Sequence, residues 1–351
     1  MVYLMFIICF FVALGLTPLV KRLAVRIGAT DKPNARKVHT KVMPRMGGLA
    51  IYLAFIVGIL ILWPQSSYTV PLLLGSVVVM ITGILDDLYS LPAKLKMVAH
   101  FFAALIIVNG GISVTFINMP FNGVLYLHWF SVPLTLLWIM GITNAINLID
   151  GLDGLAAGVS SIVLLTIAGL SLTQGNLFVF TVSAVLLASI LGFLPFNFHP
   201  AKIFMGDSGA YFLGYVISVL ALLGFKNVTL FSLVVPIVML AVPISDTLFA
   251  IVRRLVHKKP LTAPDKSHLH HCLLRFGFSQ RQTVILIYGM SALFALAAIV
   301  LSTSTLLGSL LVILCVMLTI ELVVEGVGLV SANYKPLLKA YKRIVSLGRV
   351  K

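Results

Sequence analysis

Long apolar segments recur along the whole of this chain and limit the folds that it can adopt. Each is close to the roughly 20 residues that an α-helix needs to cross the hydrocarbon core of a bilayer. We interpret about eleven segments as spans: residues 2–20, 46–63, 71–86, 97–114, 131–149, 155–173, 177–195, 209–224, 229–252, 284–302 and 305–328. Because 60% of the residues are hydrophobic and 10% are charged, the sequence predicts an all-α, polytopic integral membrane protein.

The lysines and arginines indicate how the chain crosses the bilayer, because basic residues in short loops are retained on the cytoplasmic side. With this set of spans, all 25 Lys and Arg residues except Lys226 fall on one face, which predicts an N-terminus outside and a cytosolic C-terminus. The asymmetry accounts for most of the net charge of +15, so we expect the lipid bilayer and no nucleic acid as a partner. No tandem repeat or second soluble domain is visible, and residues 1–351 are expected to form a single transmembrane domain.

Half of the ten acidic residues are aspartates that lie where apolar segments end: Asp86, Asp87, Asp150, Asp153 and Asp207. A carboxylate at the edge of the hydrocarbon is costly, so such residues usually mark an ion, a substrate charge or a proton path. Adjacent like charges resist joint ionisation, so one of Asp86 and Asp87 would suit proton transfer unless a cation neutralises both. Lys94 and Lys96 are candidates to neutralise them or to hold a phosphate, and the alternative is a solvated helix end.

The fifth span ends in oxygen-bearing side chains at every third position: Asn144, Asn147, Asp150 and Asp153. On a helix they would form one polar ridge. Gly151 and Gly154 predict that the helix opens at Asp150 and leaves Asp153 on a tight turn that a ligand can approach closely. Ordinary packing is the alternative.

Asp207 is a single carboxylate between glycines, directly before the eighth span. With Ser208 it is a candidate helix cap. It is equally a candidate ligand for Mg²⁺, which commonly takes one or two protein carboxylates and completes its shell with phosphate and water.

Three histidines, His268, His270 and His271, precede Cys272 in the last loop before the tenth span. A structural zinc site needs a closed ligand set, and no second Cys-His cluster completes one. Beside basic residues, the histidines suit the oxyanion and hydroxyl groups of a phosphorylated ligand, with a solvated polar loop as the alternative.

Together these features place carboxylates, amides, lysines and histidines on one membrane face, which suits a magnesium-bound polyphosphate whose partner lies in the bilayer. The loops expected to form this active site are residues 21–45, 86–96, 150–154, 197–208 and 253–283. A polytopic secondary transporter is the main alternative, although transporter sites usually lie near the midplane on broken helices. A non-enzymatic membrane scaffold is a third possible function.

Three acidic residues lie inside spans. Asp246 is expected to face Arg253 or Arg254, and Glu321 and Glu325 are expected to approach the cytosolic interface. Residues 115–130 follow the fourth span and, with Asn122-Gly123, predict a hairpin.

Five motifs resemble the polyprenyl-phosphate N-acetylhexosamine-1-phosphate transferases. They are Asp86-Asp87 with its trailing lysines, residues 144–155, residues 204–209, the His268–His271 loop, and residues 31–39 running on to Pro44-Arg45-Met46-Gly47-Gly48. The His-x-His-His form is similar to members that use UDP-GlcNAc, and the nearest resemblance is to the type that initiates wall teichoic acid. Cys272 departs from the basic residue that follows the histidines in that family.

The resemblance implies transfer of GlcNAc-1-phosphate from UDP-GlcNAc to undecaprenyl phosphate, with release of UMP. The enzyme would act at the cytosolic face of a bacterial plasma membrane, and a homodimer is a possible assembly. It implies Mg²⁺, or Mn²⁺, on Asp207 and Asn147, and an acceptor phosphate positioned or deprotonated by Asp86 beside Asp87. The residues implied to hold the lipid phosphate are Lys94 and Lys96. Those implied to bind the nucleotide sugar are Asp153, Gly151, Phe204, His268, His270, His271 and Lys37, with the Met46–Gly48 turn.

Overall fold

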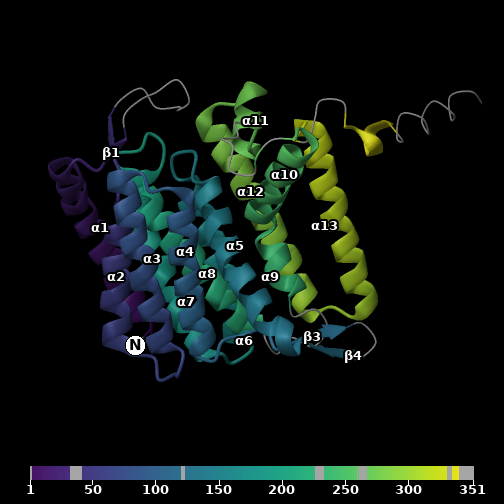
Figure 1. Cartoon of the computed structure of the whole chain (residues 1–351), viewed down its shortest axis with the longest axis horizontal. Coiled ribbons are helices and arrows are strands. Elements are labelled where there is room, and N and C mark those ends of the chain that lie inside the picture. Colours follow the sequence, from purple (N-terminus) through teal and green to yellow (C-terminus); the bar gives the residue numbers. More distant parts are fainter. Residues whose placement is uncertain are drawn as a thin grey trace, which may run out of the picture.

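The computed structural model of the chain describes residues 2–31, 42–119, 123–225, 233–258, 260, 267–329 and 334–339. It is a bundle of long helices with short strands at its two ends (Figure 1). The helices are α1 (Val2–Ile27), α2 (Gly47–Leu62), α3 (Thr69–Tyr89), α4 (Ala93–Asn109), α5 (Ser131–Ile149), α6 (Leu155–Thr173), α7 (Leu177–Asn197), α8 (Gly206–Phe225), α9 (Val234–Met239), α10 (Ala241–Val256), α11 (Leu269–Arg275), α12 (Gln280–Thr303) and α13 (Leu306–Val327).

Among the described residues, eight helices are long and apolar enough to cross a membrane: α1, α3, α5 with the turn before it, α6, α7, α8, α12 and α13. The apolar helix α2 is shorter. This arrangement agrees with the predicted polytopic, mostly helical membrane protein. Each predicted span coincides with a helix except residues 229–252, where two helices, α9 and α10, meet at Leu240. Pro243 explains the break, because it has no N–H to donate to the carbonyl of Met239.

Helix α8 lies in the middle of the bundle and packs against α2, α3, α5 and α6. Two glycines allow the closest of these contacts. A Cβ on Gly48 of α2 would overlap the backbone of Gly209, and one on Gly83 of α3 would overlap the backbone of Ser208. The start of α8, and with it Asp207, is therefore held backbone to backbone between α2 and α3.

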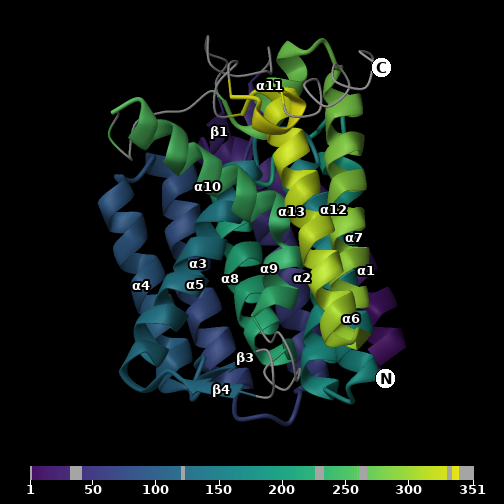
Figure 2. The same cartoon turned by 90° about the vertical axis from the view of Figure 1, so that its right-hand side faces the viewer.

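The two ends of the bundle differ. At one end the strands β3 (Phe116–Met119) and β4 (Gly123–Tyr126) form the predicted antiparallel hairpin, at the same end of the bundle as the N-terminus of the chain but on the opposite side (Figure 2). At the other end lie α11 and the strand pair β1 (Thr30–Asp31) and β2 (Met43–Pro44). Glu325, in the last turn of α13, accepts the backbone N–H groups of Leu337 and Leu338 there.

Candidate active site

Asp87 accepts hydrogen bonds from the first turn of α8 and holds it in place. It lies in the last turns of α3 rather than in the loop, because α3 continues to Tyr89. Its carboxylate accepts the backbone N–H of Asp207 at 2.9 Å, the backbone N–H of Ser208 at 3.1 Å and the Ser208 hydroxyl at 2.7 Å. These are the contacts of a helix cap supplied from another helix, so neither Asp207 nor Ser208 caps α8 by itself. The catalytic role implied for Asp87 stays a prediction.

Asp86 is almost fully buried, at 1% exposure, and three donors hold its carboxylate. Oδ2 accepts the Lys96 ammonium at 2.6 Å and the Tyr211 hydroxyl at 2.8 Å, and Oδ1 accepts the backbone N–H of Leu91 at 2.9 Å. These three donors hold the carboxylate in one orientation. The predicted proximity of Asp86 to Lys96 is therefore present, whereas Lys94 is exposed in the first turn of α4.

Asp207 and Asn147, the residues implied to hold a metal, lie in contact. The Asn147 side-chain amide donates to Asp207 Oδ1 at 2.7 Å, across from α5 to α8. On the other oxygen, Arg45 Nη2 donates to Oδ2 at 3.2 Å. The Asp207 side chain keeps 19% of its surface exposed, so an ion in solution can reach it.

The chemistry of this donor set fits magnesium or manganese. Within the described parts of the chain, no three His, Cys, Asp or Glu side chains converge as a ready-made metal cluster. Mg²⁺ does not need one, because it commonly takes one or two carboxylates and completes its shell with substrate phosphate and water. One carboxylate and one amide oxygen, partly open to solvent, meet that requirement.

No individual role was predicted for Arg45, although it ends the expected active-site loop of residues 21–45. It directly follows β2, and its guanidinium lies 3.2 Å from Asp207, 3.5 Å from Asp87 and 4.0 Å from Asp31. Burial alone would lower the pKa of the guanidinium, but the charges of these three carboxylates and of Asp86 outweigh that effect and raise it. The sequence signal that marks Arg45 is its place directly before the Met46-Gly47-Gly48 turn.

Asp150 caps the C-terminal end of α5, where the sequence predicts that the helix opens. It is half-buried, and this burial, together with the charges of Asp207 and Asp87, raises the pKa of its carboxyl to about 8. Asp150 therefore carries a proton at neutral pH in the absence of a bound cation.

Asp153 anchors the loop between α7 and α8. Its Oδ2 lies 2.8 Å from His199 Nδ1 and accepts the backbone N–H of Ala201 at 3.1 Å. The contact of Asp153 with the nucleotide stays a prediction. No role was predicted for His199, although it lies in the expected active-site loop of residues 197–208.

The segment that carries Phe204 pairs with the Met46–Gly48 turn. Phe204 donates its backbone N–H to the carbonyl of Pro44 at 2.9 Å, and Gly47 donates to the carbonyl of Phe204 at 2.9 Å. Gly48 donates to the carbonyl of Met205 at 2.8 Å. The turn and the Phe204 ring, which is half-buried, therefore border the same site as Asp207. Lys37 lies outside the described residues.

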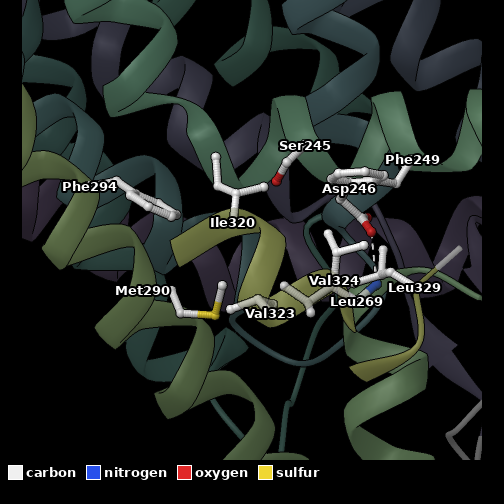
Figure 3. A pocket seen from close by; sticks show the side chains of 10 residues that line it. All are labelled: Ser245, Asp246, Phe249, Leu269, Met290, Phe294, Ile320, Val323, Val324 and Leu329. Atoms are coloured by element: carbon white, nitrogen blue, oxygen red, sulfur yellow. Dashed lines mark hydrogen bonds between the residues drawn. The ribbon is translucent and has the colours of Figure 1, made fainter. Parts of the chain in front are cut away.

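The histidine loop is organised by Asp246. Its carboxylate lies 2.8 Å from His268 Nδ1 and accepts the backbone N–H of Leu269 at 2.8 Å, which caps α11. Both oxygens thus have partners in the histidine loop, and the expected contact with Arg253 or Arg254 stays a prediction. Figure 3 shows Asp246 directed at Leu269, on the edge of a cavity between α10, α11, α12 and α13 whose other lining side chains are apolar except for Ser245.

His270 is buried against the loop that follows α5. A Cβ on Gly151 would overlap the His270 ring, so Gly151 gives that ring its space. Burial, with His271 beside it, lowers the pKa of His270 to about 3, and the ring is neutral. The rings of His268 and His270 lie parallel at 6.0 Å and those of His270 and His271 lie 4.2 Å apart. The histidine loop and Gly151, which are both implied to bind the nucleotide sugar, therefore lie in packing contact.

The bundle and its charged end define a class of protein: a polytopic membrane protein with carboxylates, an amide and a lysine gathered where its helices end. A model of the family described as glycosyl transferase family 4 matches residues 69–225. Over 344 residues, 97% of this chain and 96% of the relative, the chain is 50% identical to a probable undecaprenyl-phosphate N-acetylglucosaminyl 1-phosphate transferase of Bacillus subtilis.

Two more distant relatives carry similar names. A decaprenyl-phosphate N-acetylglucosaminephosphotransferase of Mycolicibacterium smegmatis is 36% identical over 301 residues, which are 77% of this chain and 74% of the relative. An undecaprenyl-phosphate alpha-N-acetylglucosaminyl 1-phosphate transferase of Thermotoga maritima is 31% identical over 281 residues, which are 80% of this chain and 84% of the relative. The chain belongs to glycosyl transferase family 4, and the family predicted from its motifs is confirmed.

Proposed function

We propose that this protein transfers GlcNAc-1-phosphate from UDP-GlcNAc to undecaprenyl phosphate, giving undecaprenyl-diphospho-GlcNAc and UMP. One observation carries the proposal: Asp207, at the start of the buried helix α8, contacts Asn147 at the end of α5, and Asp86 at the end of α3 contacts Lys96 at the start of α4. The names of the relatives supply the donor and the lipid acceptor. The reaction would be the first membrane step of a teichoic acid or of another surface polysaccharide.

We place the site at the cytosolic face of a bacterial plasma membrane. The shorter helices α2 and α4 and the broken pair α9 and α10 lie alongside the eight long helices (Figure 1) and would bring the crossings to the predicted eleven. The N-terminus and the β3–β4 hairpin would then be outside, and β1, β2 and α11, flanked by basic residues, would be in the cytosol. A homodimer stays a prediction.

Asp207 and Asn147 would hold magnesium on the donor diphosphate, with manganese as a substitute. Bound there, the cation would neutralise charge on the transferred phosphoryl group. Phe204 and the Met46–Gly48 turn lie beside Asp207 and would bind the nucleotide end. Asp153, through His199 and Ala201, would keep the Phe204 segment in place.

Lys96 would hold the acceptor phosphate. Its ammonium uses one donor on Asp86, and its remaining N–H groups are available for phosphate oxygens. In the transfer, an acceptor phosphate oxygen forms a bond to the β-phosphorus of UDP-GlcNAc, and the bond from that phosphorus to the bridging oxygen breaks, so that the electron pair leaves with UMP. Asp86 would position Lys96 through the 2.6 Å contact between the carboxylate and the ammonium.

Direct attack by the acceptor is better supported than a covalent aspartyl intermediate. The oxygens of Asp86 are engaged by Lys96, Tyr211 and Leu91, and those of Asp87 by the start of α8. A nucleophilic carboxylate would have to give up several of these donors.

The test is reconstitution of the purified full-length protein with sugar-labelled UDP-GlcNAc, undecaprenyl phosphate and Mg²⁺. We expect lipid-linked label and an equal amount of UMP, both lost on chelation and in Asp207→Ala. Arg26→Gln, an exposed change in α1, is the matched control and should act like wild type. If the wild type forms no lipid-linked product, while Asp207→Ala supports growth as well as wild type does, the proposal is wrong.

A further inference from the structure

Arg45 is held by three carboxylates and bound closely by none. Its guanidinium lies 3.2 Å from Asp207, 3.5 Å from Asp87 and 4.0 Å from Asp31. Close charge-assisted pairs between Arg and a carboxylate are usually bidentate, at about 2.7–2.9 Å. The contacts of Arg45 are longer and spread over several acids, as expected of a counter-ion to the whole group rather than of one fixed salt bridge.

The carboxylates around Arg45 differ in their other partners. Asp87 is fully engaged by three donors at the start of α8, so its position does not depend on Arg45. Asp207 shares its two oxygens between Asn147 and Arg45. Arg45 therefore occupies an oxygen of the side chain that we propose as the metal ligand.

The backbone at Arg45 is fixed while its side chain has room to move. The Arg45 N–H donates to the carbonyl of Ala29 at 2.9 Å, and the preceding Pro44 accepts from Phe204 at 2.9 Å. The side chain is 25% exposed and starts next to the segment of Phe204, where the donor nucleotide is proposed to lie. A swing of the guanidinium from Asp207 toward a diphosphate needs no backbone movement.

A divalent cation and a guanidinium compete for the Asp207 carboxylate, because two positive charges that close to each other repel. A guanidinium that leaves the carboxylate has a planar fork of donors that matches phosphate oxygens.

We propose that Arg45 changes partners during the reaction: it neutralises Asp207 and Asp87 before the donor binds, and it contacts the diphosphate of the nucleotide sugar once a divalent cation is held by Asp207. This inference rests on the proposed function, and it adds a donor-binding residue that also competes with the metal. An arginine with a purely structural role would not compete with the metal. Removal of Arg45 should instead raise the affinity for the divalent cation and lower the affinity for the nucleotide sugar.

The experiment measures two affinities of the full-length protein in detergent. The first is the affinity for Mn²⁺ without nucleotide, from the free Mn²⁺ signal in electron paramagnetic resonance. The second is the affinity for UDP-GlcNAc at saturating Mn²⁺. In Arg45→Gln we expect Mn²⁺ to bind at least about threefold more tightly, and UDP-GlcNAc to bind about tenfold or more weakly.

Arg26→Gln removes the same charge at an exposed position of α1 and should change neither affinity. Arg45→Lys keeps the charge without the planar fork, so Mn²⁺ affinity should stay within about twofold of wild type while UDP-GlcNAc binding weakens. If Arg45→Gln does not fold, the UDP-GlcNAc affinity of Arg45→Lys tests the inference. Weaker or unchanged Mn²⁺ binding in Arg45→Gln, or unchanged donor binding in both variants, would overturn the inference.

Asp207→Ala separates this inference from the proposed function. Loss of Mn²⁺ binding in that variant supports Asp207 as the metal ligand, whatever the Arg45 variants do. If Asp207→Ala binds Mn²⁺ like wild type, the proposed metal site fails and the partner change of Arg45 fails with it.

Discussion

The Tyr211 hydroxyl on α8 donates a hydrogen bond of 2.8 Å to the buried carboxylate of Asp86 on α3. The same oxygen accepts Lys96 at 2.6 Å, so one atom joins α3, α4 and α8. The position of Lys96 thus depends on a hydroxyl that lies one turn into the most buried helix of the bundle.

Tyr211→Phe should slow the reaction and leave the fold intact. It removes one donor from Asp86 and keeps the ring, which packs edge-on against His100 at 4.5 Å. A hydrogen bond to a charged group contributes about 1.5–3 kcal/mol, so we expect the rate at saturating substrates to fall about tenfold or more. Tyr215→Phe is the matched control one turn further along α8, because its hydroxyl makes only long bonds, of 3.3 and 3.4 Å, to Leu72 and Pro71. Equal rates for the two variants would contradict this role.

Asp87→Asn should destabilise the protein by weakening the start of α8. The amide keeps one accepting oxygen and loses the negative charge, so we expect a loss of about 1–2 kcal/mol and a lower Tm in detergent. Ser208→Ala removes one of the same hydrogen bonds and should cost less. Because the two residues are partners, the double variant should be less destabilised than the sum of the single ones. An unchanged Tm in Asp87→Asn would show that the cap contributes nothing.

The raised pKa of Asp150 should make the free energy of unfolding decrease as the pH rises. The folded pKa of about 8 lies above the unfolded value of 3.8, so the folded state holds a proton that the unfolded state has lost. The stabilisation is complete below pH 3.8 and is lost as the pH rises through about 8. Asp150→Asn cannot ionise, so at pH 8.5, without divalent cations, its Tm should exceed that of wild type by at least about 2 °C. At pH 5 the difference should be smaller; a difference that does not depend on pH would contradict the prediction.

Gly151→Ala should displace His270, because the added Cβ would overlap the imidazole ring. We expect a lower Tm and at least about a tenfold loss of activity, since the histidine loop and the end of α5 could no longer pack together. Gly141→Ala, on α5 itself, adds a Cβ that meets nothing within 4 Å and serves as the control. Equal activity of the two variants would exclude a dependence of the site on this contact.

The sequence predicts the helical bundle, the hairpin and most residues of the candidate active site. These features follow from long apolar segments and from clusters of polar side chains, which are local patterns in the sequence. The family resemblance implies that Asp207 and Asn147 share a site, and in the structure the start of α8 and the end of α5 bring them into contact. The cap formed by Asp87 joins residues 120 and 121 positions apart, and no local pattern marks such a pairing.

Other partners were missed for related reasons. Arg45 is one of eight basic residues between Lys21 and itself, which as a group indicate orientation and hide the one that meets carboxylates. The pairing of Asp153 with His199 depends on how two loops meet, and that of Asp246 with His268 depends on the break between α9 and α10.

The loop between α7 and α8 is attached along its whole length: Asn197 holds Ile203, Asp153 holds Ala201, and Phe204 pairs with Pro44 and Gly47. Ordering a backbone costs roughly 1–2 kcal/mol of conformational entropy per residue, and this loop is already ordered before the donor binds. Binding of a donor beside Phe204 therefore has to order only side chains such as that of Arg45, and only this ordering lowers the affinity. The backbone N–H groups of the loop between α7 and α8 should consequently be protected from hydrogen exchange to a similar extent with and without nucleotide.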